Sequence, residues 1–349
     1  MKRYFYIMNF KISYKGYIKS VLIISVSIYA ILFVLVKIIV DPYNEFNLFE
    51  LEINKTTYTV SRKITPYLLS DKLIEHKYNL VFGTSRSALV DNEILGAETL
   101  NLSPGVYGNP TDVYHFLSTL SEQKLNNINT IYYLVDYHVF NTKKSYYEDF
   151  SYPNTLFLRL INSLKTFHIN DIESAYTTVK YNLQNYTGYK IGENGNDIFS
   201  KEFLPSKKEN FLTFVHTEPL TFSSKSFQDL KRLNEFCIEH KIPITYFNFP
   251  IYSKYLKTFD MNEIEKQMGH VLESVKEVYE LRYTPSISND FTMFSSVNHV
   301  NYTGLKEAMK YFQEDNLINK NNITKFYKSK WSKLQDKEDS DKKFQNILD

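Results

Sequence analysis

The longest apolar run in the chain is Val21–Val40, VLIISVSIYAILFVLVKIIV, and Lys37 is its single charge. A helix of that length rises about 30 Å, which is the thickness of the hydrocarbon core of a bilayer. Lys37 lies near one end, where its long stem is expected to reach the headgroups. Because the run is apolar on every face, it favours a transmembrane helix over a core helix. The pattern predicts one membrane anchor at residues 21–40.

The charges on the two sides of this run differ in sign. The flank before it carries only basic charges: Lys2, Arg3, Lys11, Lys15 and Lys19. The flank after it carries only acidic ones: Asp41, Glu45, Glu50 and Glu52. By the positive-inside rule, residues 1–20 are then cytoplasmic and the main domain is extracytoplasmic. A cleaved signal peptide is the alternative, but the run is long and no A-x-A-like site follows it. We therefore expect an uncleaved, single-pass anchor in the cell membrane.

From residue 41 onward, short apolar runs alternate with amphipathic stretches. Runs rich in strand formers occupy residues 78–83, 129–140 and 242–250. Helical periodicity marks residues 226–240, 262–280 and 304–317, and a weak strand candidate lies near 281–285. Strands separated by helices of this length predict βαβ units and a parallel sheet covered on both faces. We expect an exported α/β domain over residues 41–322.

Two segments break this alternation. Residues 141–225 are rich in Tyr, Asn, Ser and Thr and have weak periodicity. We interpret them as an insertion that caps one edge of the sheet, with a position over the active site as one hypothesis. Residues 323–349 are crowded with Lys, Asp and Glu, which predicts a charged tail that is solvated or frayed.

The composition narrows the class of function. The formal net charge is +2, and six of the 41 basic residues precede residue 41, where no acidic residue occurs. The remainder therefore has 35 basic against 39 acidic residues, which argues against a nucleic-acid-binding face. Cys237 is the only cysteine, so a disulfide within the chain is excluded, as is a zinc site that needs two cysteines. Its helical spacing from Leu230 and Leu233 predicts a buried core thiol.

The first motif with candidate chemistry is FGTSRS, Phe82–Ser87. A buried strand ends there, Gly83 allows a tight turn, and Ser85 follows. In open α/β sheets, ligands bind at the carboxyl ends of strands. A serine in such a turn can attack a carbonyl while neighbouring backbone N–H groups stabilise the oxyanion. The same pattern also occurs as a simple helix cap.

The second motif is NLSPGVYGNPTDVYHFL, Asn101–Leu117. Gly105 and Gly108 precede Pro110, which suits the first position of a helix. A glycine before a helix can present its N–H group to an anion. An ordinary glycine-rich loop is the alternative.

The third motif is SSVNHVNYTG, Ser295–Gly304. It places His299 in a polar loop directly before the predicted closing helix. Of the eight histidines, His299 has the setting that best suits a general base, while the others fall on helices, beside strands or in the insertion.

Together the three motifs resemble, in order, the blocks of the SGNH/GDSL hydrolase superfamily over about residues 78–317. The resemblance implies a three-layer sandwich with a central parallel, flavodoxin-like sheet. GTSRS resembles the first block and places the nucleophile at Ser85, whose N–H also serves the oxyanion hole. NLSPGVYG resembles the second block, in which a glycine donates to the oxyanion, and Gly108 fits the helix start better than Gly105. NHVNYTG resembles the last block and places the base at His299.

Two positions depart from the family pattern. The Asp that usually stands three residues before the His is Ser296 here, and in a Ser–His–Asp triad an amide in place of the carboxylate costs about 10⁴ in kcat. Either another acid such as Asp290 or Asp136 takes that role, or the enzyme works as a slow dyad, or activity is lost. The usual oxyanion-donor Asn of the third block is Asp136, so Asn101 or Asn141 could supply the donor instead.

Candidates for substrate contact are Arg86, Asn101 and Asp136. Asp136 has two further interpretations, because it could be structural or could bind the base.

The DPY sequence at residues 41–43 and the GTSR form of the first block narrow the resemblance to a membrane-anchored branch. That branch includes proteins of alginate and cellulose O-acetylation and of teichoic-acid D-alanylation. It implies a Ser/His-dependent esterase or O-acyltransferase that modifies a cell-surface polysaccharide or another envelope polymer without a metal or cofactor. The implied partners are the lipid bilayer, the polymer or acyl donor, and a membrane-bound O-acyltransferase.

Two alternatives come from other classes of protein. One is a catalytically degraded SGNH-fold protein that binds glycans or assists assembly, and the other is a plain structural ectodomain.

Overall fold

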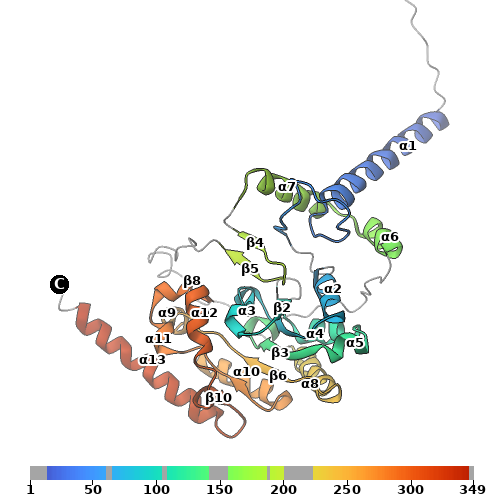
Figure 1. Ribbon diagram of the computed structural model, residues 1–349. Helices are drawn as coiled ribbons and strands as arrows, with labels where there is room; N and C mark the ends of the chain where they lie inside the picture. The colour runs from blue at the N-terminus through green and yellow to red at the C-terminus, as the bar shows by residue number, and fades with distance from the viewer. Residues whose placement is uncertain are drawn as a thin grey trace, which may run out of the picture. The chain divides into compact units, whose positions relative to one another are not determined.

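The structure is a computed structural model, and it describes residues 14–59, 65–103, 108–140, 156–186, 189–199 and 223–345. The chain forms two compact units. The helix unit comprises Met1–Lys55 and Pro153–Gln184, and the sheet unit comprises Thr56–Tyr152 and Asn185–Asp349. Each unit is described by itself (Figure 1).

The sheet unit is built on six strands: β1 Tyr78–Phe82, β2 Thr99–Asn101, β3 Ile128–Leu134, β6 Ile244–Phe247, β7 Val278–Tyr279 and β10 Leu317–Ile318. Their order across the sheet is β10-β7-β6-β3-β1-β2 (Figure 1). The pairs β1–β2, β1–β3, β3–β6 and β6–β7 are parallel, and β10 runs antiparallel to β7. The predicted α/β class with a mostly parallel central sheet is confirmed.

Strand β1 shows how this sheet is buried. Leu80 and Phe82 belong to one hydrophobic cluster, and Val81 belongs to another. Because successive side chains of a strand point to opposite faces, both faces of β1 are covered. All three side chains are fully buried. Burial on both faces explains why the strand is a continuous apolar run instead of an alternating one.

Helices connect and flank these strands (Figure 1). The α-helices of the sheet unit are α2 Thr65–Ser70, α3 Asn92–Leu95, α4 Pro110–Ser118, α5 Glu122–Asn126, α8 Ser224–Glu239, α9 Ser253–Leu256, α10 Met261–Ser274, α11 Pro285–Ser288, α12 Tyr302–Met309 and α13 Ile323–Gln345. Short 3₁₀ segments are η2 Asp71–Ile74, η3 Ser85–Ser87, η4 Tyr137–Phe140, η6 Phe291–Met293 and η7 Glu314–Asn316. Two antiparallel hairpins pair β4 Tyr189–Ile191 with β5 Asp197–Phe199, and β8 Phe294–Ser296 with β9 His299–Val300.

The elements after residue 260 differ in part from the prediction. The helix predicted over 262–280 ends at Ser274, and β7 takes Val278–Tyr279, ahead of the strand expected near 281–285. The closing helix α12 ends at Met309, before the predicted residue 317. Tertiary pairing decides both ends, because β7 pairs with β6 through Phe247 and with β10 through Leu317.

The charged segment after residue 323 folds as the long helix α13, drawn in dark red in Figure 1. The structure differs here from the expected solvated tail, because Tyr327 and Leu334 are buried. Phe326 and Trp331 are half-buried and pack against the same hydrophobic cluster. A few apolar residues at helical spacing are therefore enough to fix the first half of the helix.

The helix unit begins with α1, Tyr14–Phe33, which continues without a break as the π-helical η1, Val34–Val40. One helix of the described chain, Gly16–Val40, is long and apolar enough to cross a membrane by length and composition. Two further helices, α6 Leu156–Thr166 and α7 Ile169–Leu183, complete the unit, and α7 packs against η1.

Lys37 does not reach outward as expected. Its side chain is 3% exposed, and its ammonium lies 3.1 Å from Glu45 and 3.5 Å from Asp171. The hydroxyl of Ser163 donates to both carboxylate oxygens of Glu45 at 2.8 and 2.7 Å. The charge is retained inside the protein because two carboxylates neutralise it there.

The predicted insertion at 141–225 is divided between the two units. Residues 156–184 belong to the helix unit, and the β4–β5 hairpin belongs to the sheet unit. Residues 141–155 and 200–222 lie outside the described residues. A position of this segment over the active site stays a prediction.

Candidate active site

The turn after β1 presents Ser85 to solvent. Gly83 is required there, because a Cβ at this position would lie 2.3 Å from Ser87 Oγ and 2.7 Å from Leu134 Cβ. Thr84 then caps η3, its hydroxyl accepting from the N–H of Arg86 at 3.3 Å. The result is an exposed serine hydroxyl at the carboxyl end of a buried parallel strand, where open α/β sheets bind ligands.

A hairpin from the far end of the chain brings His299 to this serine. His299 opens β9, which pairs with β8 in a register that sets Ser296 opposite His299. Nε2 of His299 lies 2.8 Å from Ser85 Oγ. Asn301 caps the following helix α12 by accepting from the N–H of Gly304 at 2.9 Å, which fixes the chain after the hairpin. The separation is shorter than the limit of about 3–4 Å that the sequence-based hypothesis sets.

The second ring nitrogen of His299 faces neutral oxygens. Nδ1 lies 2.8 Å from Asn298 Oδ1 and 3.0 Å from Ser296 Oγ. The Ser296 hydroxyl also donates to Asn298 Oδ1 at 3.2 Å, and Asn298 Nδ2 donates to the Tyr137 hydroxyl at 3.3 Å. This network holds the amide oxygen toward the ring. It favours the tautomer with the proton on Nδ1, which leaves Nε2 free to accept a proton from Ser85.

Asn298 is not among the residues predicted from sequence. The position three before the histidine, Ser296, does reach Nδ1, but the shorter contact belongs to the residue directly before the histidine. An Asn beside a His is common in loops, so the sequence carries no signal for this contact. Only the tight β8–β9 turn folds the neighbouring side chain back onto the ring.

A buried ion pair, Arg86–Asp136, lies beside the serine and the histidine. Arg86 and Asp136 are 3% and 0% exposed, and Arg86 Nη1 is 3.0 Å from Asp136 Oδ1. Arg86 Nε donates to the carbonyl of Asn298 at 2.7 Å, and Nη2 donates to the carbonyls of Phe249 and Pro250 at 2.7 and 3.2 Å. One guanidinium therefore joins the serine turn, the histidine hairpin and the end of β6.

Asp136 has a second partner in the same turn. Its Oδ2 accepts from the hydroxyl of Thr84 at 2.9 Å. Arg86 and Asp136 are both buried and bonded within the protein, where they link the serine turn to the histidine hairpin. Their predicted contact with substrate, and the role of Asp136 as a third triad member, stay predictions.

The side chain of Asn101 also forms its hydrogen bonds within the protein. Its amide Nδ2 donates to the carbonyls of Ser87, Ala88 and Val90 at 2.7, 3.2 and 2.8 Å, and its Oδ1 accepts from the N–H of Ser103 at 3.0 Å. Asn101 therefore clamps the segment after the serine. Its predicted role as an oxyanion donor or substrate contact stays a prediction.

Of the two glycines in the second motif, the structure describes Gly108 but not Gly105. Gly108 has a φ of +63°, and a Cβ there would lie 2.3 Å from the carbonyl oxygen of Gly83. Its backbone therefore packs directly on the turn that carries Ser85. Its own carbonyl accepts a short hydrogen bond from the buried hydroxyl of Tyr133. Gly105 and Asn141 lie outside the described residues, so their predicted roles as oxyanion donors stay predictions.

Asp290, another predicted third member of the triad, bonds to a residue of its own turn. Its Oδ1 accepts from the N–H of Thr292 at 2.9 Å and from the Thr292 hydroxyl at 2.6 Å, which caps η6. The contacts of His299 Nδ1 go to Asn298 and Ser296 instead. The described ranges contain no cluster of three or more His, Cys, Asp or Glu side chains that could hold a metal ion.

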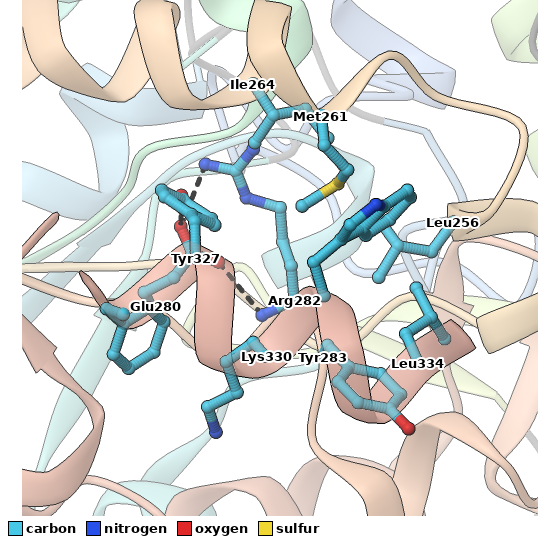
Figure 2. Close-up of a pocket in the computed structure, with 11 residues that line it drawn as sticks. Leu256, Met261, Ile264, Glu280, Arg282, Tyr283, Tyr327, Lys330 and Leu334 are labelled. Atoms are coloured by element: carbon cyan, nitrogen blue, oxygen red, sulfur yellow. Dashed lines mark hydrogen bonds and ion pairs between the residues drawn. The ribbon is translucent and has the colours of Figure 1, made fainter. Parts of the chain in front are cut away.

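A small cavity lies elsewhere in the sheet unit, between α13 and the segment after β7 (Figure 2). Its volume of about 20 Å³ is enough for a single water-sized molecule. Glu280 lies 2.9 Å from Arg282 Nη2 and accepts from the hydroxyl of Tyr327 at 2.6 Å. Neither Ser85 nor His299 lines it. The cavity is therefore separate from the serine–histidine site.

Neither a scan against protein-family models nor a search of curated proteins finds a match for this chain. The choice of function therefore rests on the site itself. The exposed Ser85 hydroxyl contacts the imidazole of His299, and a buried ion pair lies beside them. Such an arrangement can carry out nucleophilic acyl chemistry.

Proposed function

We propose that this chain is a Ser/His-dependent esterase or O-acyltransferase of the SGNH/GDSL type. The observation that carries the proposal is the 2.8 Å contact between Ser85 Oγ and His299 Nε2 at the end of a parallel strand. A nucleophile and a general base require that geometry. The mostly parallel sheet, with β1 covered on both faces, supports the finer proposal of a three-layer SGNH-like sandwich.

In the proposed reaction, Ser85 Oγ attacks the carbonyl carbon of an ester while His299 Nε2 takes the hydroxyl proton. The carbonyl electron pair moves onto the oxygen, and the N–H groups of Ser85 and Gly108 are the proposed donors to that oxyanion. Collapse expels the alcohol, which leaves with the proton from Nε2, and Ser85 is acylated. Water or a sugar hydroxyl then attacks the acyl group and gives its proton to Nε2. The second intermediate collapses as Nε2 returns this proton to the departing Ser85 Oγ, which regenerates the enzyme and releases the acid or the new ester.

The neutral oxygens at His299 Nδ1 set an expectation for the rate. When Nε2 takes the proton, the imidazolium donates from Nδ1 to Asn298 Oδ1. Hydrogen bonds to neutral acceptors contribute less than those to carboxylates. We therefore expect turnover that depends on Ser85 and His299 but is slower than in a triad completed by an aspartate.

The apolar helix Gly16–Val40 supports a proposed location. We place the helix across the cell membrane and the sheet unit outside the cytoplasm, with an envelope polysaccharide or a related polymer as acceptor or substrate. A tether keeps the site near polymer that is still close to the membrane. A membrane-bound O-acyltransferase is the proposed source of the acyl group.

The deciding experiment compares Ser85→Ala, His299→Ala and the matched control Ser118→Ala, an exposed serine on α4. Hydrolysis of p-nitrophenyl acetate and covalent labelling by a fluorophosphonate are measured on the full chain. We expect both signals to persist in Ser118→Ala and to vanish in Ser85→Ala. If Ser85→Ala retains the activity and the label, the proposal is wrong.

The second candidate function is a glycan-binding or assembly protein that keeps the fold without turnover. The observation that favours it is that His299 Nδ1 contacts two neutral oxygens, Asn298 Oδ1 at 2.8 Å and Ser296 Oγ at 3.0 Å. Glycan-array binding that survives in the Ser85→Ala/His299→Ala double variant, with no hydrolysis by the wild type, would support this candidate over the enzyme.

A further inference from the structure

A buried cluster of charged side chains in the helix unit limits how much of its long helix can face lipid. Lys37, Glu45 and Asp171 form the enclosed ion-pair cluster at the end of η1. Burial within the protein begins at Phe33, whereas the residues before it are almost all exposed. From Gly16 to Val34 the helix rises about 27 Å, close to the hydrocarbon thickness of a bilayer. The last turns of the helix therefore belong to the protein, and the lipid-facing part ends near Val34.

Helix α6 is fixed to that helix just before this boundary. The hydroxyl of Tyr29 donates to the carbonyl of Leu164 at 2.8 Å. The ring of Phe167, which follows α6, packs edge-on against the rings of Tyr29 and Phe33 at 5.5 and 5.7 Å. Tyr29 precedes Val34 by five residues, or about 7 Å along the helix. Helices that lie in a membrane interface are buried about 5–10 Å at the headgroup boundary, so the attachment point has the right depth.

The surface of α6 has the composition that this depth requires. Its first turn exposes Leu156, Phe157 and Leu158, and Phe157 is 70% exposed. Leu164 and Ile169 extend the exposed apolar surface along and past the helix. Ser163, two turns after Leu156, is buried against Glu45 and bonds α6 into the protein. A helix that is bonded into the protein and exposes large apolar side chains suits a position in a membrane interface.

We propose that α6 lies in the headgroup region of the outer leaflet, with Leu156–Leu158 inserted into lipid beside the transmembrane helix. The partner is a lipid surface, because α6 bonds to the spanning helix close to the boundary near Val34 and exposes large apolar side chains. The proposal rests on the proposed membrane span and is independent of the serine–histidine chemistry. A second contact with the bilayer restricts how the helix unit can tilt about its anchor.

Site-specific labelling of the full chain in vesicles tests the depth of α6. Cys237 is fully buried and burial raises the pKa of its thiol to about 12, so an introduced exposed cysteine is labelled selectively. An environment-sensitive fluorophore is placed at Phe157→Cys on α6, at Ile24→Cys on the spanning helix, and at Ile238→Cys on α8. Ile238 is the matched control, because at 68% it is as exposed as Phe157. Unmodified chain provides the labelling background.

The vesicles contain phosphatidylcholine and phosphatidylglycerol, with a spin label either near the headgroup or near the chain end. We expect shallow spin labels to lower emission at Phe157→Cys by about twofold, deep labels to act most on Ile24→Cys, and neither to act on Ile238→Cys. Equal quenching at Phe157→Cys and Ile238→Cys overturns the proposal. So does a blue-shifted but unquenched signal at Phe157→Cys, which indicates that protein covers the patch. Loss of quenching at Ile24→Cys refutes the span itself, and none of these outcomes bears on Ser85.

Discussion

Replacing Asn298 by Asp supplies the carboxylate that faces His299 in a complete triad. The two side chains have the same size, so an oxygen stays 2.8 Å from Nδ1. The neighbouring hydroxyl groups of Ser296 and Tyr137 can both donate a hydrogen bond to a carboxylate at this position. The Ser296 hydroxyl already donates to this position, and burial raises the pKa of Tyr137, so its hydroxyl stays protonated and can donate in turn.

The size of the effect follows from the charge that appears on the ring during catalysis. Two unit charges 4 Å apart interact by about 4 kcal/mol at an effective dielectric constant of 20. Ser85 and the edge of the ring face solvent, which reduces this figure to about 1–2 kcal/mol. Because 1.36 kcal/mol is a factor of ten in rate, we expect Asn298→Asp to raise kcat by about 5- to 30-fold.

The assay is hydrolysis of p-nitrophenyl acetate by the wild type, Asn298→Asp, Ser85→Ala and the double variant. The rise should occur only where Ser85 is present. Asn298→Ala should lower kcat by about 2- to 10-fold, because one of two acceptors is lost and Ser296 remains. A rate that does not rise in Asn298→Asp, at unchanged thermal stability, would refute the assignment of Asn298 as the group that orients His299. A rise that persists without Ser85 would refute it as well.

Three further predictions concern stability and accessibility. Gly108→Ala places a methyl group against a backbone carbonyl at a positive φ and should cost about 2–5 kcal/mol in urea unfolding, whereas Gly96→Ala, at a similar φ but with open space around it, should cost only about 1–2 kcal/mol. Asp136→Asn leaves Arg86 buried without its charge partner and should cost about 3–5 kcal/mol; a cost below about 1 kcal/mol would contradict the inferred role. Cys237 should resist Ellman's reagent until the protein unfolds. Because its folded pKa of about 12 exceeds the ordinary 9.0, stability should fall as pH rises above about 9, where only the unfolded thiol ionises.

The strands and helices that the sequence predicts well are those whose signal is local. β1 and α8 fall within two residues of their predicted ranges, and β6 falls within three. A strand buried on both faces is a continuous apolar run, and an amphipathic helix repeats every three or four residues, so each can be recognised without its neighbours. The two-residue strand at Val278–Tyr279 has no such signal, because only its pairing with β6 makes it a strand.

Contacts between distant segments are the part that the sequence does not contain. Lys37 is expected at the headgroups from its position in an apolar run, yet Asp171 on α7 and Glu45 bury it. In the same way, Arg86 is a plausible substrate contact in a turn beside Ser85, until the hairpin and the end of β6 occupy its donors.

The sequence by itself determined the apolar run, the α/β class, and the pairing of Ser85 with His299 as the chemical hypothesis. These depend on residue type, period and order along the chain. Only the tertiary structure decided that Asn298 faces the imidazole, that Arg86 and Asp136 form a buried pair beside the site, and that α6 contacts the apolar N-terminal helix. Each of these depends on where side chains from separate segments meet in space, and the free energy of those contacts has no counterpart in any single stretch of sequence.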